Sequence, residues 1–199
     1  MKVQHDRRFL QSDNKMDINS AKPQLYYLAY GSNLHPLRLL ERVPSARFVG
    51  LVEMPGYRLC FHKKHQQDGS GKCNMFQTGD HTDSVIGAIY GMNADEKALL
   101  DRCEGPGYRC DTISLQHKGI GYQCFVYIAE ASHIDDQLVP HCWYHNIVLL
   151  GAQFHDFPPE YITAIRKVES AKDPDIERHR TNYQLIEKMK SYRVLQATE

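Results

Sequence analysis

The stretch YYLAYGSNLHPLRLL, residues 26–40, constrains the fold more than any other part of the chain. Its first residues are apolar and β-prone and, with Leu25, predict a buried strand over residues 25–30. After Gly-Ser-Asn the chain resumes as a leucine-rich segment with Pro36 in its first turn, which predicts a short helix over 36–43. The strand must therefore turn into a helix through a short loop of small and polar residues.

This loop, Gly31-Ser32-Asn33-Leu34, has two interpretations. Gly31 lets the backbone approach a ligand closely, and N–H groups at a helix start favour a carboxylate or a developing oxyanion. Alternatively, the loop is an ordinary turn, because Ser and Asn are common helix-capping residues. These residues alone favour the ordinary turn, since short glycine motifs also occur by chance.

The rest of the chain contains further short β-prone runs. We expect strands at residues 46–54, 57–63, 74–78, 83–92, 112–117 and 123–129. The Pro-Gly pair at 55–56 predicts a hairpin between the first two runs, and KGIGY predicts a second hairpin between the last two. Gly87 is expected at a β-bulge.

Helices are expected over residues 93–104, 141–152 and 158–170, and again from about residue 175. Asn93 and Glu96 approximate a capping box for the first of these, and Gly105 is placed to end it. The run 141–152 is also compatible with a buried strand. In the last helix the apolar residues form a narrow stripe of Ile176, Tyr183 and Ile186.

Tight turns between neighbouring strands imply mostly antiparallel pairing. The predicted fold class is therefore α+β (mixed), with a mostly antiparallel, barrel-like sheet and surrounding helices. We expect a single domain over residues 25–199, with its core at 26–170 and a C-terminal helical segment at 173–195. Residues 1–24 are polar and unpatterned and are expected to be a flexible N-terminal arm.

Charge and cysteine content argue against several classes of protein. Lys+Arg and Asp+Glu each number 24, so neither a nucleic acid nor an anionic membrane surface is an expected partner. No apolar run approaches the roughly 18 residues of a membrane-spanning helix, and the N-terminus lacks the apolar core of a secretory signal. The six cysteines form no C-x-x-C pair. Reduced thiols and a cytoplasmic location are therefore expected.

Glu104 is a candidate for proton transfer. It lies at the C-terminal end of a predicted helix, where the helix dipole disfavours a charged carboxylate, and Asp101 on the same face acts in the same direction. Such a carboxyl group would suit proton shuttling near neutral pH. Arg102 and Arg109 could cancel this effect. The alternative is a solvated glutamate at a helix end, which is the usual case.

His141 and His145 have the i, i+4 spacing of metal ligands on a helix. No third ligand is evident nearby in the sequence, so no metal site is expected. Trp143 and Tyr144 are interpreted as packing or pocket residues.

Taken together, the successive segments YLAYGSNL, PSARFVGLVEMPGYRLCF, VIGAIYGMNADEKALLDRCEG and WYHNIVLLGA resemble the γ-glutamylcyclotransferase family. The likeness covers roughly residues 26–170 and overturns the ordinary interpretations of the loop and of Glu104. The sequence departs from the family pattern at GKCNMFQ and at IDDQLVPHCW. The second of these segments is a loop that helps related enzymes select the leaving amine.

The resemblance implies a barrel-like fold with a pocket at one end. It implies that a γ-glutamyl amide cyclises on itself, releasing 5-oxoproline and a free amine without a metal or organic cofactor. The catalytic residue carried over from the family is Glu104, and the substrate-binding residues are Tyr30, Gly31, Ser32, Asn33, Leu34 and Tyr144. The expected partner is a small-molecule γ-glutamyl substrate, and a homodimer is possible.

The leaving amine stays open. The substrate is expected to be a γ-glutamyl amino acid or peptide. The alternatives are a γ-glutamylamine, glutathione or a γ-glutamyl-protected metabolite. A different class of function is a non-catalytic module that binds a small carboxylate in the same pocket.

Overall fold

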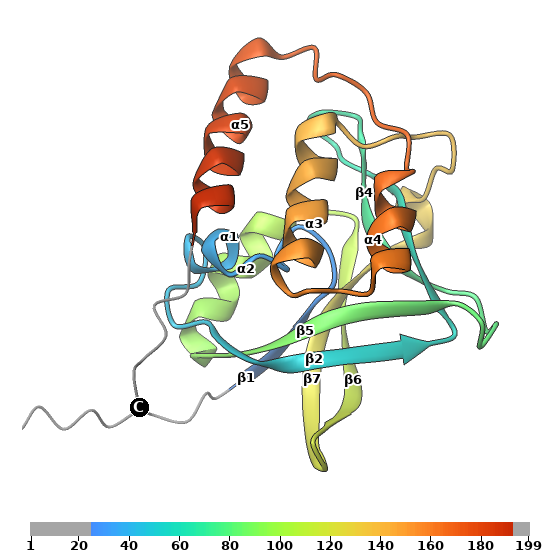
Figure 1. The fold of residues 1–199 in the computed structure, drawn as a ribbon, viewed down its shortest axis with the longest axis vertical. Coiled ribbons are helices and arrows are strands. Elements are labelled where there is room, and N and C mark those ends of the chain that lie inside the picture. Colours follow the sequence, from blue (N-terminus) through green and yellow to red (C-terminus); the bar gives the residue numbers. More distant parts are fainter. Residues whose placement is uncertain (1–24, 193–199) are drawn as a thin grey trace, which may run out of the picture.

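The computed structural model describes residues 25–192 (Figure 1), so the arm expected at 1–24 and residues 193–199 lie outside the described residues. Its strands are β1 (Leu25–Ala29), β2 (Arg47–Pro55), β3 (Tyr57–Lys64), β4 (Gly71–Gln77), β5 (Ser84–Met92), β6 (Tyr108–His117) and β7 (Ile120–Ala129). Its α-helices are α1 (Pro36–Leu40), α2 (Lys97–Glu104), α3 (Cys142–Phe154), α4 (Pro159–Arg166) and α5 (Ile176–Ser191). Short 3₁₀ turns occupy Ala94–Glu96 and Ala131–His133.

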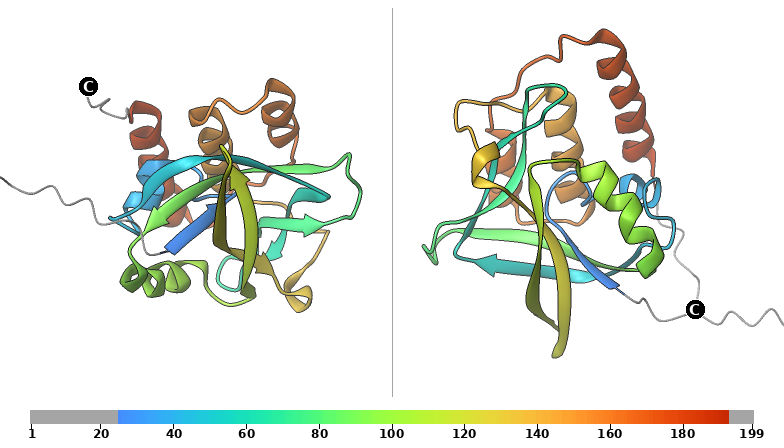
Figure 2. Two further views of the ribbon diagram at one scale, coloured as in Figure 1. Left: turned by 90° about the horizontal axis from the view of Figure 1, so that it is seen from below. Right: turned by 180° about the vertical axis from the view of Figure 1, so that it is seen from behind.

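The strands form two sheets rather than one closed barrel. Five strands pair in the order β2-β5-β1-β7-β6, and β3 pairs with β4 alone. All pairs are antiparallel except β1 with β7. The sheets meet where the Asn74 side chain on β4 accepts the Ala129 N–H of β7, at 2.9 Å. The views in Figures 1 and 2 show α3, α4 and α5 together on one side of the larger sheet. The mixed α+β fold is thus confirmed, with a barrel-like but open arrangement.

The hairpin predicted around residues 55–56 is wrong. β2 and β3 do follow each other through Gly56, but β2 pairs with β5 and β3 pairs with β4. Gly56 has φ +81° and turns the chain out of one sheet and into the other. Its N–H donates to the Asp83 carbonyl, which holds the turn against the start of β5. The turn signal located the change of direction, whereas the partner of each strand depended on contacts distant in sequence.

Other local predictions divide between confirmed and wrong. The β6–β7 hairpin and the end of α2 at Gly105 are confirmed, as is the helix expected over 141–152, which spans Cys142–Phe154. The irregularity in β2–β5 pairing lies between Phe48 and Gly50, not at Gly87. The capping box predicted at Asn93 and Glu96 is wrong: Asn93 makes no side-chain cap, and the Glu96 carboxylate accepts hydrogen bonds from Ser45.

The apolar stripe predicted for the last helix is partly wrong. Ile186 is buried as expected, but Ile176 is 80% exposed, and Met189 takes a buried place on this helix. None of the helices within residues 25–192 is long and apolar enough to cross a membrane.

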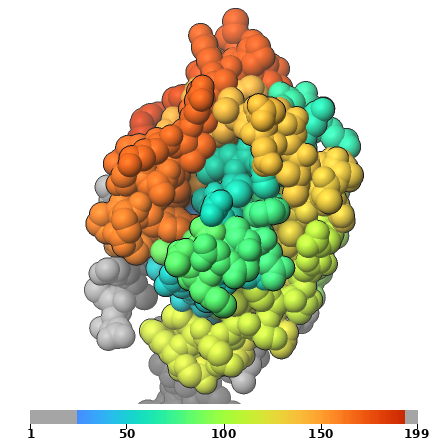
Figure 3. Space-filling view, turned by 90° about the vertical axis from the view of Figure 1, so that its right-hand side faces the viewer, coloured from blue at the N-terminus to red at the C-terminus, as the bar shows by residue number. Residues whose placement is uncertain are grey.

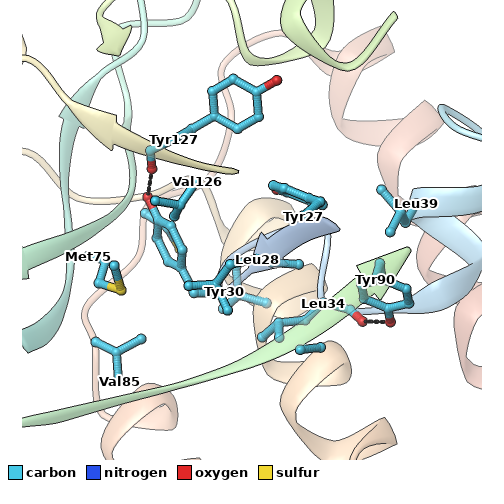
Figure 4. Packing of buried hydrophobic residues seen from close by; sticks show 14 of the residues in the cluster. Tyr27, Leu28, Tyr30, Leu34, Leu39, Met75, Val85, Tyr90, Val126 and Tyr127 are labelled. Atoms are coloured by element: carbon cyan, nitrogen blue, oxygen red, sulfur yellow. Dashed lines mark hydrogen bonds between the residues drawn. The ribbon is translucent and has the colours of Figure 1, made fainter. Parts of the chain in front are cut away.

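The core is built around β1 and its neighbours. Leu28 and Ala29 are fully buried in the centre of the larger sheet, and Ile147 and Val148 of α3 are equally buried. Two tyrosine hydroxyls inside this core donate to backbone carbonyls, Tyr30 to Tyr127 at 2.5 Å and Tyr90 to Leu34 at 2.7 Å (Figure 4). The end of β1 and the loop after it are therefore fixed by buried hydrogen bonds as well as by apolar packing.

Gly151 allows α3 to lie directly against this loop. A Cβ atom at position 151 would come within 2.6 Å of the Leu34 Cβ and 3.1 Å of the His35 backbone nitrogen. Contacts this short require the helix or the loop to move. The absence of a side chain at this position therefore sets the distance between the helix and the loop.

We expect Gly151→Ala to destabilise the protein by about 1–2 kcal/mol, because overpacking at the loop outweighs the better helix propensity of alanine. Gln153→Ala, at an exposed position of the same helix, is the matched control and should change stability by less than about 0.5 kcal/mol. Urea unfolding of the three proteins measures the difference. Equal stability of the Gly151 variant and wild type would contradict the close approach.

Candidate active site

The loop after β1 is a tight turn that leads into α1. The Leu34 N–H donates to the Gly31 carbonyl at 3.0 Å, and the His35 side chain accepts the Leu37 N–H at 3.2 Å as the cap of α1. Gly31 packs closely on β4, since a Cβ there would meet the Cys73 Cβ at 2.8 Å. The loop is therefore both a helix start and a surface held against the smaller sheet.

Asn33 joins this loop to the end of α2. Its Nδ2 donates to Glu104 Oε1 at 2.7 Å and to the Tyr27 hydroxyl at 3.0 Å. Its Oδ1 accepts a hydrogen bond of 2.8 Å from Arg42, whose guanidinium lies 3.5 Å from the same Glu104 oxygen. The loop after β1 and the glutamate at the end of α2 are thus joined by the buried amide of Asn33, although Asn33 and Glu104 lie 71 residues apart in the sequence.

Asn33 and Arg42 both donate to Oε1 of Glu104, whose side chain is only 16% exposed. No donor among residues 25–192 reaches Oε2 in a hydrogen bond. Asp101, expected to act on Glu104, instead accepts hydrogen bonds from Lys97 at 2.7 Å and from Tyr127 at 2.5 Å. The carboxylate of Glu104 is thus oriented by one oxygen while the other stays available to a ligand.

Tyrosine hydroxyls surround this carboxylate. Tyr144 accepts the Cys73 N–H at 3.1 Å, and Tyr108 donates to the Cys73 carbonyl at 2.5 Å. Burial, together with nearby acidic groups including Glu104, raises the pKa of Tyr30, Tyr108 and Tyr144 well above the usual range. These phenols are therefore neutral at physiological pH and bring no negative charge to the site. The hydroxyl hydrogens of Tyr30 and Tyr108 are already donated to the carbonyls of Tyr127 and Cys73.

The site is a cleft with two connected parts. Its inner recess has a volume of about 20 Å³ and is lined by Tyr27, Tyr30, Gly31, Ser32, Asn33, Cys73, Glu104, Tyr108, Tyr127 and Tyr144. Its outer part has a volume of about 130 Å³ and is lined by Ser32, Arg38, Arg42, His65, Asp68, Lys72, Cys103, Glu104, Tyr108, Trp143, Tyr144 and Arg178. Glu104 belongs to both parts. It therefore lies between a small polar recess and a wider, cation-rich entrance.

Larger hollows lie elsewhere on the molecule. A groove of about 580 Å³ runs between β3 and α4, beside the orange atoms in Figure 3, and is lined by Phe61, Tyr161 and Ile165 among others. Another of about 320 Å³ separates β4 from β6 and β7. Neither contains a predicted site residue, so size alone does not locate the chemistry.

The outer part of the cleft is bordered by Arg178, which forms an ion pair between α5 and the segment before it. Asp173 is fully buried and accepts hydrogen bonds of 2.6 Å from Arg178 Nε and 2.8 Å from Trp143 Nε1. Burial raises the pKa of Asp173, but these bonds outweigh that effect and hold the pKa well below the usual range. Asp173 thus positions Arg178 and Trp143 at the cleft.

Six of the seven predicted site residues line the cleft: Tyr30, Gly31, Ser32, Asn33, Tyr144 and Glu104. Leu34 does not. Its side chain is 1% exposed in the core, and its carbonyl accepts from the Tyr90 hydroxyl at 2.7 Å. Leu34 therefore anchors the loop, and its N–H is used within the turn.

Sequence reasoning missed the cations and several tyrosines of the cleft. The pair Arg38 and Arg42 had a usable signal, because residues four apart beside a helix start lie on one face. Lys72 and Arg178 had none, since they come from a strand and from a helix far along the chain.

The histidine pair does not form part of a metal site. His145 Nε2 is hydrogen-bonded to the Ile165 carbonyl at 2.8 Å, and His141 lies 3.8 Å from Asp173. Within residues 25–192, no cluster of three or more His, Cys, Asp or Glu could hold a metal ion. All six cysteines are free thiols.

Comparison with known proteins identifies the family. The family model described as "Gamma-glutamyl cyclotransferase, AIG2-like" matches residues 27–146, which include both the loop and Glu104. The chain belongs to this cyclotransferase family. Proteins named γ-glutamylcyclotransferase from Mus musculus and Homo sapiens are 27% and 28% identical over 151 residues, covering 72% of this chain and 78% of each relative.

The cyclotransferase fold is also found in solved structures. A structure titled γ-glutamyl cyclotransferase superposes with a TM-score of 0.68 at 24% identity, covering 82% of this chain and 98% of the other. An uncharacterized protein from Homo sapiens gives a TM-score of 0.66 at 25% identity with the same coverage. The family match ends at residue 146, so α4, α5 and Arg178 lie beyond it.

We expect Asp173→Asn to lower stability by about 3 kcal/mol, because a buried ion pair then loses one partner. This corresponds to a Tm lower by roughly 6–12 °C. Because the pKa of Asp173 is lower in the folded than in the unfolded protein, its carboxylate stabilises the fold at pH values above the unfolded-state pKa. This contribution is lost as the pH falls toward the folded-state pKa. The difference between wild type and variant should therefore be largest near neutral pH and shrink below about pH 4.

The control is Glu177→Gln, which removes an exposed partner of Arg180 and should change the Tm by less than about 2 °C. Calorimetry at several pH values measures both. A constant difference across pH, or an equal effect of the two substitutions, would contradict the buried ion pair.

Proposed function

We propose that this chain is a γ-glutamylcyclotransferase that releases 5-oxoproline from γ-glutamyl amides, with an amino acid or peptide as the leaving amine. The observation that carries the proposal is the Glu104 carboxylate, held by Asn33 at the mouth of the recess formed by the Gly31–Asn33 loop. Family membership and the names of the mouse and human relatives support the same reaction class.

The reaction needs a base before it needs anything else. The α-ammonium of the substrate cannot attack, so Glu104 removes one proton through its free oxygen. The amine then attacks the γ-carbonyl carbon of the same glutamyl group and closes a five-membered ring. Because attack is intramolecular, holding the substrate folded supplies much of the rate enhancement.

The tetrahedral intermediate carries a negative oxygen and a leaving nitrogen. N–H groups of the Gly31–Asn33 loop bind a substrate oxygen, either the α-carboxylate or this oxyanion. Glu104 then returns its proton to the departing nitrogen as the oxyanion re-forms the carbonyl and the C–N bond breaks, so one carboxyl group acts as base and then as acid. The ring nitrogen passes its second extra proton through the regenerated Glu104 carboxylate to the freed amine, which leaves as an ammonium. Tyr30 and Tyr144 line the cleft and place neutral hydroxyl groups beside the bound substrate. These steps use protein side chains and backbone only.

Glu104→Gln should lower kcat by about 10²–10⁴-fold, because it preserves the acceptor for Asn33 but removes the proton carrier. Release of 5-oxoproline from γ-glutamyl-L-alanine measures the effect. Glu187→Gln, at an exposed position of α5, is the control and should keep wild-type activity. A Glu104 variant with near-wild-type kcat would refute the assignment of the base.

A panel of other amides tests the substrate class. γ-Glutamylamines, glutathione and γ-glutamyl-protected metabolites are the alternatives for this site. Stabilisation by 5-oxoproline with no turnover of any amide would instead favour a non-catalytic carboxylate-binding module.

A further inference from the structure

The outer part of the cleft contains four cationic side chains, and three of them already have partners. Lys72 pairs with Asp68 at 2.8 Å, and both side chains are less than a tenth exposed. Arg178 is paired with Asp173 at 2.6 Å, and Arg42 donates to Asn33 at 2.8 Å and lies 3.5 Å from the Glu104 carboxylate. These three charges are therefore compensated within the protein.

Arg38 is the exception. It lies on α1, four residues before Arg42, and lines the outer part of the cleft. Its Nε is buried without a hydrogen-bond partner, and no carboxylate within residues 25–192 forms a salt bridge with it. Burial and the charge of Arg42 lower the pKa of Arg38 to about 9, so the guanidinium is still charged at neutral pH. Arg38 as a whole is half-buried, so its charge is partly removed from water without a carboxylate to pair it, and an anion bound in the cleft would supply that partner.

A γ-glutamyl amino acid brings two carboxylates, one on the glutamyl group and one on the leaving amine. The glutamyl end must place its amine beside Glu104, where the loop after β1 can offer backbone N–H groups to its oxygens. The recess has no Lys or Arg in its lining. The space that remains for the leaving amine beside Glu104 is the wider part of the cleft, which contains Arg38.

We propose that Arg38 determines specificity by binding a carboxylate of the leaving amine, so that amino-acid and peptide amides are preferred to amides of uncharged amines. The inference rests on the proposed function and deepens it. One unpaired guanidinium matches one carboxylate, and its planar fork can bind both oxygens. Lys72 and Arg178 form the walls around this site, because their own charges are engaged by Asp68 and Asp173.

The test compares γ-glutamyl-L-alanine with γ-glutamyl-L-alaninamide, which differ only in the carboxylate of the leaving amine. Wild type should prefer the acid by about 10- to 100-fold in kcat/KM, as expected for a charge-assisted hydrogen bond. Arg38→Met should remove this preference by raising KM for the acid while changing the amide less than about 3-fold. Arg38→Lys, which keeps the charge but loses the fork, should retain part of it.

Arg180→Met is the matched control, because Arg180 is an exposed arginine paired with Glu177 on α5. It should preserve the preference. Equal loss of kcat/KM for both substrates in Arg38→Met would show that Arg38 binds the glutamyl carboxylate, and no loss for either would show that it binds neither. Both results overturn the proposal.

The outcomes also separate this proposal from the proposed function. Turnover of both substrates without a preference in wild type refutes only the role of Arg38. No 5-oxoproline from any γ-glutamyl amide refutes the cyclotransferase activity and the specificity together. If Arg38→Met does not fold, the same comparison with Arg38→Lys decides, because an unchanged preference in that variant would overturn recognition by the fork.

Discussion

The buried amide of Asn33 is the interaction on which the candidate active site depends. It connects the loop after β1 with the end of α2 by donating to Glu104 and accepting from Arg42. Its second N–H bond reaches Tyr27, which lies in the central strand of the larger sheet. A buried polar group of this kind costs free energy if any partner is removed, so the loop and Glu104 are held in one arrangement.

The loop is fixed from its other side as well. Gly151 lets α3 approach Leu34, and the Leu34 carbonyl accepts hydrogen bonds from Tyr90 and His155. Gly31 packs against Cys73 on β4. The loop backbone is therefore held in place by contacts with α3 and with both sheets, without help from a ligand, so the site is preorganised. The outer part is different, since it depends on Asp173 and Arg178, which lie after the residues that the family model matches.

Much of the local structure was predictable. The strand before Gly31, the helix ended by Gly105 and the β6–β7 hairpin follow from short-range propensities, which neighbouring residues largely decide. Strand partners were not predictable in the same way. The Pro-Gly turn before Tyr57 looks like a hairpin turn, yet the strands on its two sides belong to different sheets. β2 pairs with β5, and β3 pairs with β4, so each strand takes its partner from further along the chain. Register and sheet membership are properties of the whole chain.

For the site, the sequence by itself indicated the family, through the joint spacing of the loop and the glutamate at the helix end, and it predicted these residues as the site through that resemblance. The sequence can indicate them because these residues form a turn or a helix end, which short-range patterns predict, and also carry the polar groups of the site. Only the tertiary structure decided that Asn33 contacts Glu104, that Leu34 belongs to the core, and that no residue within 25–192 bonds to the buried Nε of Arg38. The physical reason is that compensation of a buried charge depends on which distant segments surround it, and no local pattern records that.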